Sequence, residues 1–146
     1  MKINIIMPTH IEIWVKKKKK IPISLNRYRN AHFQISNKIK QVYKKILEEQ
    51  IDICYYQPMR VQFSIEWKIK LETPIGACLT YYHWTNHKSD IDNYCAIQSK
   101  FLQDWLVELG VIPEDNYDYV QEIVYKSGGY DKWNSRVEIE IYSLNK

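Results

Sequence analysis

The sequence predicts a single α+β domain that has a mixed, mainly antiparallel sheet and two main helices. Three observations lead to this prediction. Several stretches alternate apolar and polar residues, as strands do, and two stretches repeat apolar residues at helical spacing. The chain has 146 residues, which is close to the common size of one domain, so we treat residues 1–146 as one unit with one core.

In the first half of the chain, residues 11–15 alternate like a short strand and lead into the lysine run 16–20. We expect this run at a solvated strand end or hairpin tip, because adjacent ammonium groups repel one another. Residues 21–29 lack a clear period and contain turn formers, which favours an extended loop. Ser36 or Asn37 then begins a helix whose apolar stripe runs from Ile39 to Leu47.

In the second half, residues 61–71 show the clearest two-residue alternation in the chain, and a turn at 73–76 leads into a second strand over 77–84. The two are expected to form a hairpin. A helix is predicted from Asp92 or Asn93 to Leu109, with Gly110 as its C-terminal stop. Two further strands, 119–126 and 136–142, are expected to be joined through 127–130.

Composition narrows the classes of protein. The chain is 45% hydrophobic and 26% charged, which is typical of a folded domain and not of a disordered chain. No stretch approaches the roughly 20 apolar residues of a membrane span, and the first apolar run ends at Pro8, so we expect a cytoplasmic protein with no membrane partner. The three cysteines have no CxxC spacing, and His83, His87 and Cys95 match no zinc pattern.

The net charge of +4 hides an asymmetry between the two halves. Residues 1–70 contain 15 Lys and Arg against 5 Asp and Glu, a net charge of +10, while residues 71–146 contain 6 against 12, a net charge of −6. A basic half can lie along phosphates and an acidic half can hold cations. This pattern suits a metal-dependent enzyme that acts on nucleic acid.

The chemically distinctive residues are carboxylates at the start of the second helix. Asp90-Ile-Asp92-Asn93 is followed 23 positions after Asp92 by Asp115, in a turn before a strand. Clustered carboxylates suit Mg²⁺, which polarises a phosphodiester and lowers the pKa of a bound water. Acids at a helix N-terminus are also ordinary caps. Since a helix of this length moves the chain about 25 Å, the three meet only if the next loop folds back.

Four pieces of the sequence, in order, resemble the RusA family of phage-type Holliday junction resolvases, which cut four-way DNA junctions. They are Ser24-Leu-Asn-Arg27, Asp90-Ile-Asp92-Asn93, the helix end Leu109-Gly-Val-Ile112, and Glu114-Asp115 before a strand. The resemblance covers about residues 21 to 142. It implies a RusA-like fold, a homodimer, branched DNA as the substrate and partner, and Mg²⁺, with Mn²⁺ as an alternative, as the cofactor.

The resemblance also implies roles for single residues. Asp90, Asp92 and Asp115 match the metal-binding acids of the family, and Glu114 is a weaker candidate. The family's helix lysine corresponds to Ala96 here, so Lys100 is the replacement candidate, as if one helical turn had been inserted; Lys88 and Arg27 are alternatives. The residues expected to contact DNA are Lys16, Lys17, Lys18, Lys19, Lys20, Arg27, Arg29 and Lys88.

The leading hypothesis is therefore a Mg²⁺-dependent endodeoxyribonuclease that resolves four-way junctions by paired cuts in recombination and repair. The alternative is a non-catalytic protein that binds junctions or other nucleic acids and uses its carboxylates structurally. A third hypothesis, a protein-interaction module with exposed aromatic residues, predicts no salt-dependent affinity for DNA. Tyr28, Tyr81, Tyr82 and Tyr94 are candidates for stacking on unpaired bases, or else belong to the core.

Overall fold

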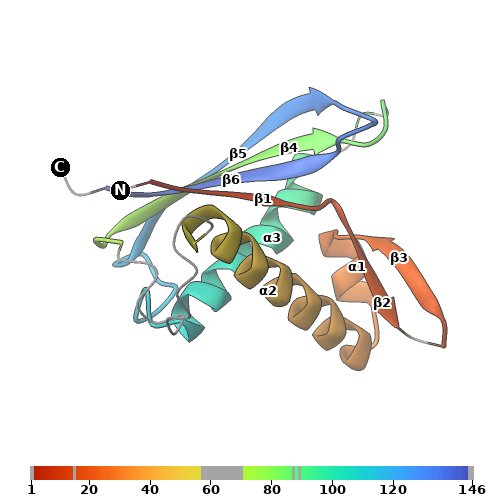
Figure 1. The fold of residues 1–146 in the computed structure, drawn as a ribbon, viewed down its shortest axis with the longest axis horizontal. Helices are drawn as coiled ribbons and strands as arrows, with labels where there is room; N and C mark the ends of the chain where they lie inside the picture. Colours follow the sequence, from red (N-terminus) through yellow and green to blue (C-terminus); the bar gives the residue numbers. More distant parts are fainter. Residues whose placement is uncertain (1, 15, 57–70, 87, 89, 145–146) are drawn as a thin grey trace.

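The computed structural model describes residues 2–14, 16–56, 71–86, 88 and 90–144, with the side chains of all of them except 51–56. It confirms the predicted class, because these residues form one α+β domain with a mixed, mostly antiparallel sheet and two main helices. In Figure 1 the sheet forms one layer, and the two long helices cover one of its faces. The predicted strand over 61–71 falls almost entirely outside the described residues, so its pairing in a hairpin stays a prediction, while the second predicted strand, 77–84, corresponds to the observed strand Ile75–His83.

Within the described residues the main sheet has four strands in the order β1-β6-β4-β5. These are β1 (Lys2–Met7), β4 (Ile75–His83), β5 (Val120–Tyr130) and β6 (Arg136–Ser143). β6 pairs antiparallel with both β1 and β4, whereas β4 and β5 are parallel. The predicted link from β5 to β6 through 127–130 was wrong: β5 continues through Tyr130, and β6 does not pair with it because β4 lies between them.

The helices are α1 (Leu25–Asn30), α2 (Phe33–Tyr56) and α3 (Ile91–Glu108), and a separate hairpin is formed by β2 (His10–Trp14) and β3 (Lys18–Pro22). α3 connects the parallel strands β4 and β5, as a crossover helix does. Gly110 ends it with a φ of 72°, a left-handed conformation that favours glycine. The extended loop expected over 21–29 was wrong, because the end of β3 and most of α1 occupy this stretch.

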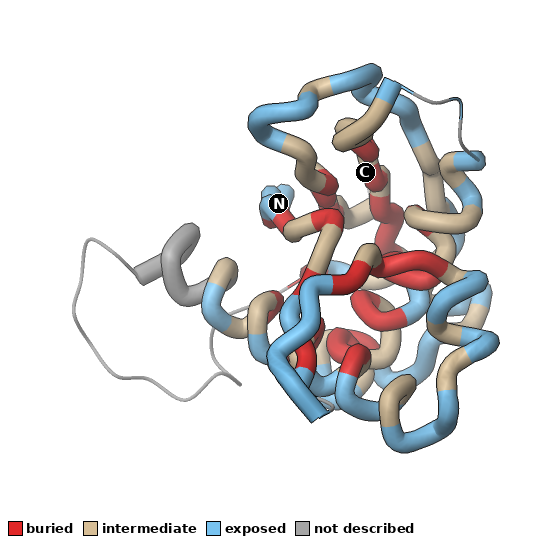
Figure 2. The backbone as a smooth tube through the Cα atoms, turned by 90° about the vertical axis from the view of Figure 1, so that its right-hand side faces the viewer, coloured by how far each residue is buried: buried red, intermediate tan, exposed pale blue. Residues whose placement is uncertain are grey.

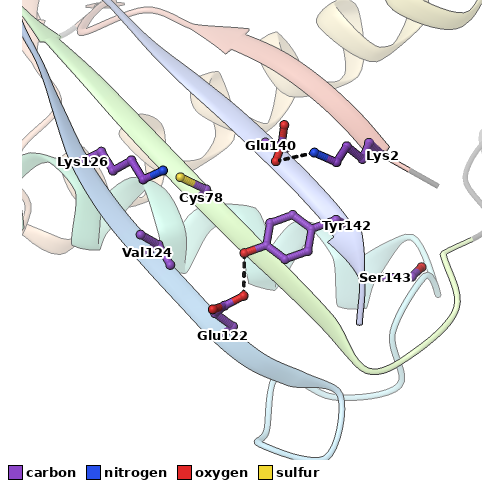
Figure 3. Close-up of a pocket in the computed structure, with 8 residues that line it drawn as sticks. All are labelled: Lys2, Cys78, Glu122, Val124, Lys126, Glu140, Tyr142 and Ser143. Atoms are coloured by element: carbon purple, nitrogen blue, oxygen red, sulfur yellow. Dashed lines mark hydrogen bonds and ion pairs between the residues drawn. The ribbon is translucent and has the colours of Figure 1, made fainter. Parts of the chain in front are cut away.

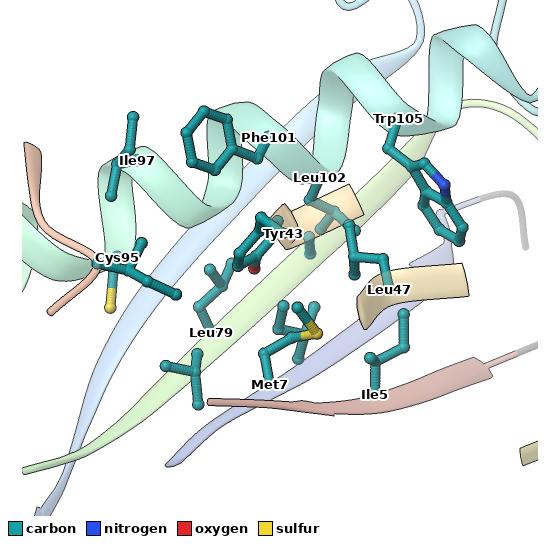
Figure 4. Close-up of a cluster of buried hydrophobic side chains, with 14 of the residues drawn as sticks. Ile5, Met7, Tyr43, Leu47, Leu79, Cys95, Ile97, Phe101, Leu102 and Trp105 are labelled. Carbon is teal, nitrogen blue, oxygen red and sulfur yellow. The ribbon is translucent and has the colours of Figure 1, made fainter. Parts of the chain in front are cut away.

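The core lies between the sheet and the two long helices (Figures 2 and 4). Every second residue of β1 and β6 points into it, which is why both strands alternate between buried and less buried positions. Phe101 and Trp105 from α3 and Tyr43 from α2 fill its middle and are at most 1% exposed. The Tyr43 hydroxyl donates to Gln98 Oε1 at 2.7 Å, so its polar atom is satisfied within the core.

Candidate functional site

The segment Asp90-Ile-Asp92-Asn93, called the acidic box or simply the box from here on, forms the start of α3. Asp90 is the N-cap, and its Oδ1 accepts a hydrogen bond from the backbone N–H of Asp92 at 3.0 Å. The helix therefore begins earlier than the predicted Asp92 or Asn93. Both aspartates are exposed residues, although Asp90 also caps the helix. The first turn thus serves as a helix cap and still presents two acids.

A hydrogen bond joins this box to the early Ser24-Leu-Asn-Arg27 stretch. The side-chain oxygen of Asn93 accepts from the backbone N–H of Asn26 at 3.0 Å, across 67 positions of sequence. Ser24 caps α1 by accepting from the N–H of Arg27 at 3.2 Å. Together the two acceptors satisfy N–H groups that the first turn of α1 leaves without helical partners. Two of the four pieces of the resemblance are therefore adjacent in space.

Asp115 lies at the other end of α3. The carbonyl of its neighbour Asn116 accepts from the N–H of Val120 at 2.9 Å, so the turn lies at the start of β5, beside Ile75. The acidic box follows the opposite end of β4, eight residues along that strand, or about 26 Å at about 3.3 Å per residue. Within the described part of the chain, no three His, Cys, Asp or Glu side chains are placed to hold one metal ion. One chain thus brings Asp90 and Asp92 together without Asp115.

Lys100 does not face the box either. It lies eight residues after Asp92 on the same helix, about 12 Å along the axis. Its ammonium is 4.0 Å from Asp104, which also pairs with Lys40 of α2 at 2.8 Å. The bond to Asp104 raises the pKa of Lys40. The Lys100 side chain remains 59% exposed, so it is a surface residue beside the contact between α2 and α3.

The cations predicted to contact DNA are all exposed and occupy three places. Lys16 and Lys17 lie in the turn of the β2–β3 hairpin, and Lys18, Lys19 and Lys20 lie on β3. Lys18 pairs with Glu12 across the hairpin at 3.0 Å. Arg27 and Arg29 lie on α1, and Lys88 precedes the cap of α3. The cations on α1 and at Lys88 therefore lie near the acidic box and far from Asp115.

A hollow of about 300 Å³ opens beside the cap of α3 and is lined by Lys88, Ile91, Tyr130 and His83, among others. It lies past the carboxyl ends of the parallel strands β4 and β5, which is where α/β sheets commonly bind ligands. The hollow is close to the two carboxylates and carries an exposed cation. The sequence pattern did not predict this hollow, because it assigned Tyr130 to a connecting turn and not to the end of a strand.

Aromatic rings fill the space behind the box. The rings of Tyr81 and Tyr94 stack with centroids 4.9 Å apart, and Trp84 packs edge-on against Tyr94 at 5.3 Å. Tyr81 is fully buried, so it is a core residue and not a platform for bases. Burial lowers the pKa of His10 and of His83, which lie at the edge of this cluster, and raises the pKa of the Cys95 thiol to about 12. His87 lies outside the described residues.

The face of the sheet that turns away from the helices carries a different set of side chains (Figure 3). A hollow of about 520 Å³ there is lined by Cys78, Lys126 and the ion pair of Lys2 with Glu140, among others. Tyr142 donates to Glu122 at 2.7 Å, which raises the pKa of the phenol to about 12. None of the predicted site residues lines this hollow, so it is separate from the acidic box.

Comparison with known proteins adds no assignment: no family model matches the chain, and no curated protein matches it. In the described part of the chain, no helix has the length and apolar character needed to cross a membrane.

Proposed function

We propose that this protein is a Mg²⁺-dependent endodeoxyribonuclease that cuts branched DNA, four-way junctions in particular. The observation that carries the proposal is the bond between Asn93 and Asn26. It places two solvent-facing carboxylates next to the arginine-bearing α1, and both segments belong to the RusA-like pattern. Acids and cations that are 60 or more positions apart in sequence are thereby neighbours on one surface.

The proposed metal ligands are Asp90 and Asp92. Mg²⁺ commonly takes only one or two carboxylates from a protein and completes its shell with waters and substrate phosphate oxygens. When bound, the ion would polarise a phosphodiester of the substrate and lower the pKa of a coordinated water. Mn²⁺ accepts the same oxygen ligands. Asp90 and Asp92 therefore suit an open Mg²⁺ site on the surface, which a large substrate can reach.

The positions favour Lys88 or Arg27 over Lys100 as the cation that stabilises charge on the phosphate. Lys88 is two residues from the cap, and Arg27 follows the residue that is bonded to the box. The lysines of the β2–β3 hairpin extend the positive surface and would neutralise further phosphates.

The test is to compare nicking of a labelled four-way junction with nicking of a linear duplex of matched sequence, in Mg²⁺. Wild type should make paired cuts in the junction alone. Asp92→Asn should abolish cutting while DNA binding persists, because a metal ligand is lost and no phosphate contact is. Asp118→Asn, which changes an exposed acid at the far end of α3, is the matched control and should cut like wild type. Equal cutting by the Asp92 and Asp118 variants would overturn the proposal.

Because Asp115 lies far from Asp90 and Asp92 within one chain, we propose that the active form is a homodimer in which Asp115 of a second copy completes the site. Asp92→Asn and Asp115→Asn should then each be inactive alone. A mixture that has exchanged subunits should regain one intact site per heterodimer and nick one strand. Full activity of Asp115→Asn would show instead that each chain works without this acid. Sedimentation equilibrium measures the oligomeric state directly.

A second candidate function is a non-catalytic DNA-binding protein. It is favoured by the distance between Asp115 and the box and by the role of Asp90 as a helix cap. It predicts tight, salt-dependent junction binding with no cuts in Mg²⁺ or Mn²⁺. In that case Asp92→Asn would leave junction binding unchanged.

A further inference from the structure

A groove of about 660 Å³ lies between the β2–β3 hairpin and α1, on the surface beyond the acidic box. Its floor is apolar and includes Ile13, Ile21 and Ile35. Ile13 and Ile21 are at most 4% exposed, so they belong to the edge of the core. Pockets of this size and apolar character are typical of sites for small organic ligands.

The walls of the groove are cationic. Lys19 from β3 and Arg27 from α1 both line it. Among the residues that the structure describes, neither of these side chains has an ion-pair partner and no carboxylate lines the groove. The groove therefore presents positive charge that the protein itself does not neutralise. An apolar floor with unneutralised cations above it fits a ligand that has a flat ring at one end and an anionic group at the other.

The rim of the groove carries aromatic rings. His32 lines the groove, and the ring of Phe33 lies 4.4 Å from it between centroids. Phe33 is 67% exposed although it is a large apolar side chain. His32 Nδ1 accepts a hydrogen bond from the N–H of Gln34 at 3.4 Å. The rim thus offers a stacking surface.

We propose that this groove holds one unpaired nucleotide of a nucleic-acid strand, with its base on the apolar floor beside the aromatic rim and its phosphate against Arg27 and Lys19. Apolar and aromatic surfaces bind bases of any sequence, and cations track the backbone. The groove borders the box, because Arg27 is next to Asn26, whose N–H is bonded to Asn93.

The inference rests on the proposed function and deepens it. A paired base within a duplex cannot enter the groove, whereas a base left unpaired at a branch can. The groove would therefore account for selection of branched over linear DNA near the acidic box. A free nucleotide has the same chemistry of ring and phosphate, so the test must separate a strand from a mononucleotide.

The test uses fluorescence anisotropy to measure the affinity for a thymidine oligonucleotide of six nucleotides and the affinity for a duplex, both at fixed salt in EDTA. The quantity compared is the ratio of the first affinity to the second. Ala31→Phe fills the groove at a position whose backbone, φ −80° and ψ 149°, accepts any L residue. It should lower the ratio by about tenfold, in the range expected for the loss of one stacked base. Thermal melting verifies that the variant folds.

Arg27→Ala is the second variant, and Arg29→Ala is its matched comparison. Both residues lie on α1, but only Arg27 lines the groove. Arg27→Ala should weaken binding of the single strand more than binding of the duplex, while Arg29→Ala should weaken both alike. Folded Ala31→Phe and Arg27→Ala proteins with an unchanged ratio would overturn the inference. So would displacement of the oligonucleotide by thymidine monophosphate at concentrations equal to those of the strand.

The two proposals fail separately. If the preference for single strands depends on the groove but the protein never cuts a junction, the nuclease proposal is wrong and the groove proposal stands. If the protein cuts junctions but neither variant changes its preference for single strands, the groove proposal is wrong and the nuclease proposal stands.

Discussion

The two ends of α3 are both rich in acids, yet they differ in what surrounds them. At the N-terminal end, Asp90 and Asp92 lie beside α1 and the exposed Lys88. At the C-terminal end, Glu114 accepts a hydrogen bond from Asn116 within its own turn, and the nearby Glu108 is paired with the buried Lys44. Eighteen residues of helix, about 27 Å, separate the two ends. Two acidic motifs can thus look alike in the sequence, while their different surroundings in the fold give their carboxylates different chemical roles.

The largest expected effect is a loss of stability when the packing of α3, the helix that separates the two ends, is disrupted. Phe101 is fully buried in the middle of α3, with its ring 5.2 Å from that of Tyr28 and 5.3 Å from that of Tyr43. Phe101→Ala should lower the free energy of unfolding by about 3–5 kcal/mol, since it leaves a cavity. Urea denaturation measures this, with Phe101→Leu as a milder control. A loss below about 1 kcal/mol in the free energy of unfolding would mean that contacts other than those of Phe101 stabilise the position of α3.

The second prediction compares the acids at the two ends directly. Asp90→Ala should lower the free energy of unfolding by about 1 kcal/mol because it removes the cap of α3. Asp115→Ala, in an exposed turn, should change it by less than about 0.5 kcal/mol. Asp90→Asn keeps a capping oxygen and should be as stable as wild type, while losing the proposed metal ligand. Equal stability losses for the two alanine variants would contradict the assigned cap.

A smaller effect is expected from the bond that distinguishes the N-terminal end. Asn93→Ala leaves the N–H of Asn26 without its acceptor and should lower the free energy of unfolding by about 0.5–1.5 kcal/mol. Asn93→Asp retains an acceptor oxygen and should lower the free energy of unfolding by less. Hydrogen exchange of the Asn26 amide is the specific readout, and it should be faster only in the alanine variant. Unchanged exchange would show that the two motif segments are not held together by this bond.

The smallest effect concerns pH and is confined to the same end. Burial lowers the pKa of His10 and His83 in the folded protein, so the unfolded chain binds protons more readily. Their contribution to stability is present above pH 6.5, the ordinary histidine pKa, and is lost as the pH falls below it. The double variant His10→Asn, His83→Asn should show a smaller drop in urea midpoint between pH 7.5 and pH 5.5 than wild type. An identical drop would exclude these histidines as the cause.

Local pattern was sufficient to predict the fold class and much of α2, α3 and β4, because these elements repeat apolar residues over many positions. Among the elements that were missed, β1 and α1 were missed for different reasons. β1 was noticed only as an apolar run ending at Pro8, and α1 has six residues, too few to show a stripe. α1 is fixed by Ser24 and by an acceptor 67 positions away, which no local window contains.

Local pattern predicted the position of some candidate site residues and missed that of others. Asp90 and Asp92 lie at a helix start and the lysine run 16–20 lies in a hairpin, as their patterns predicted, whereas Arg27 and Arg29 lie on a helix and not in a loop. That these residues form a functional site stays a prediction. Whether Asp115 joins them depends on which strands are neighbours and in which direction they run. Alternation within a strand carries no information on its partner, so the parallel pairing of β4 with β5 was not foreseen.

The strand order β1-β6-β4-β5 has a consequence for how the chain folds. Among the described strands, β6 lies between β1 and β4, so strands from opposite ends of the described chain are neighbours in the sheet (Figure 1). Lys2 of β1, for example, is opposite Tyr142 of β6. Such long-range pairing requires a large loop to close before its contacts form, which slows folding. We therefore expect the pairing of β1 with β6 to form late, and until then the edge of β1 that β6 covers is open to other chains.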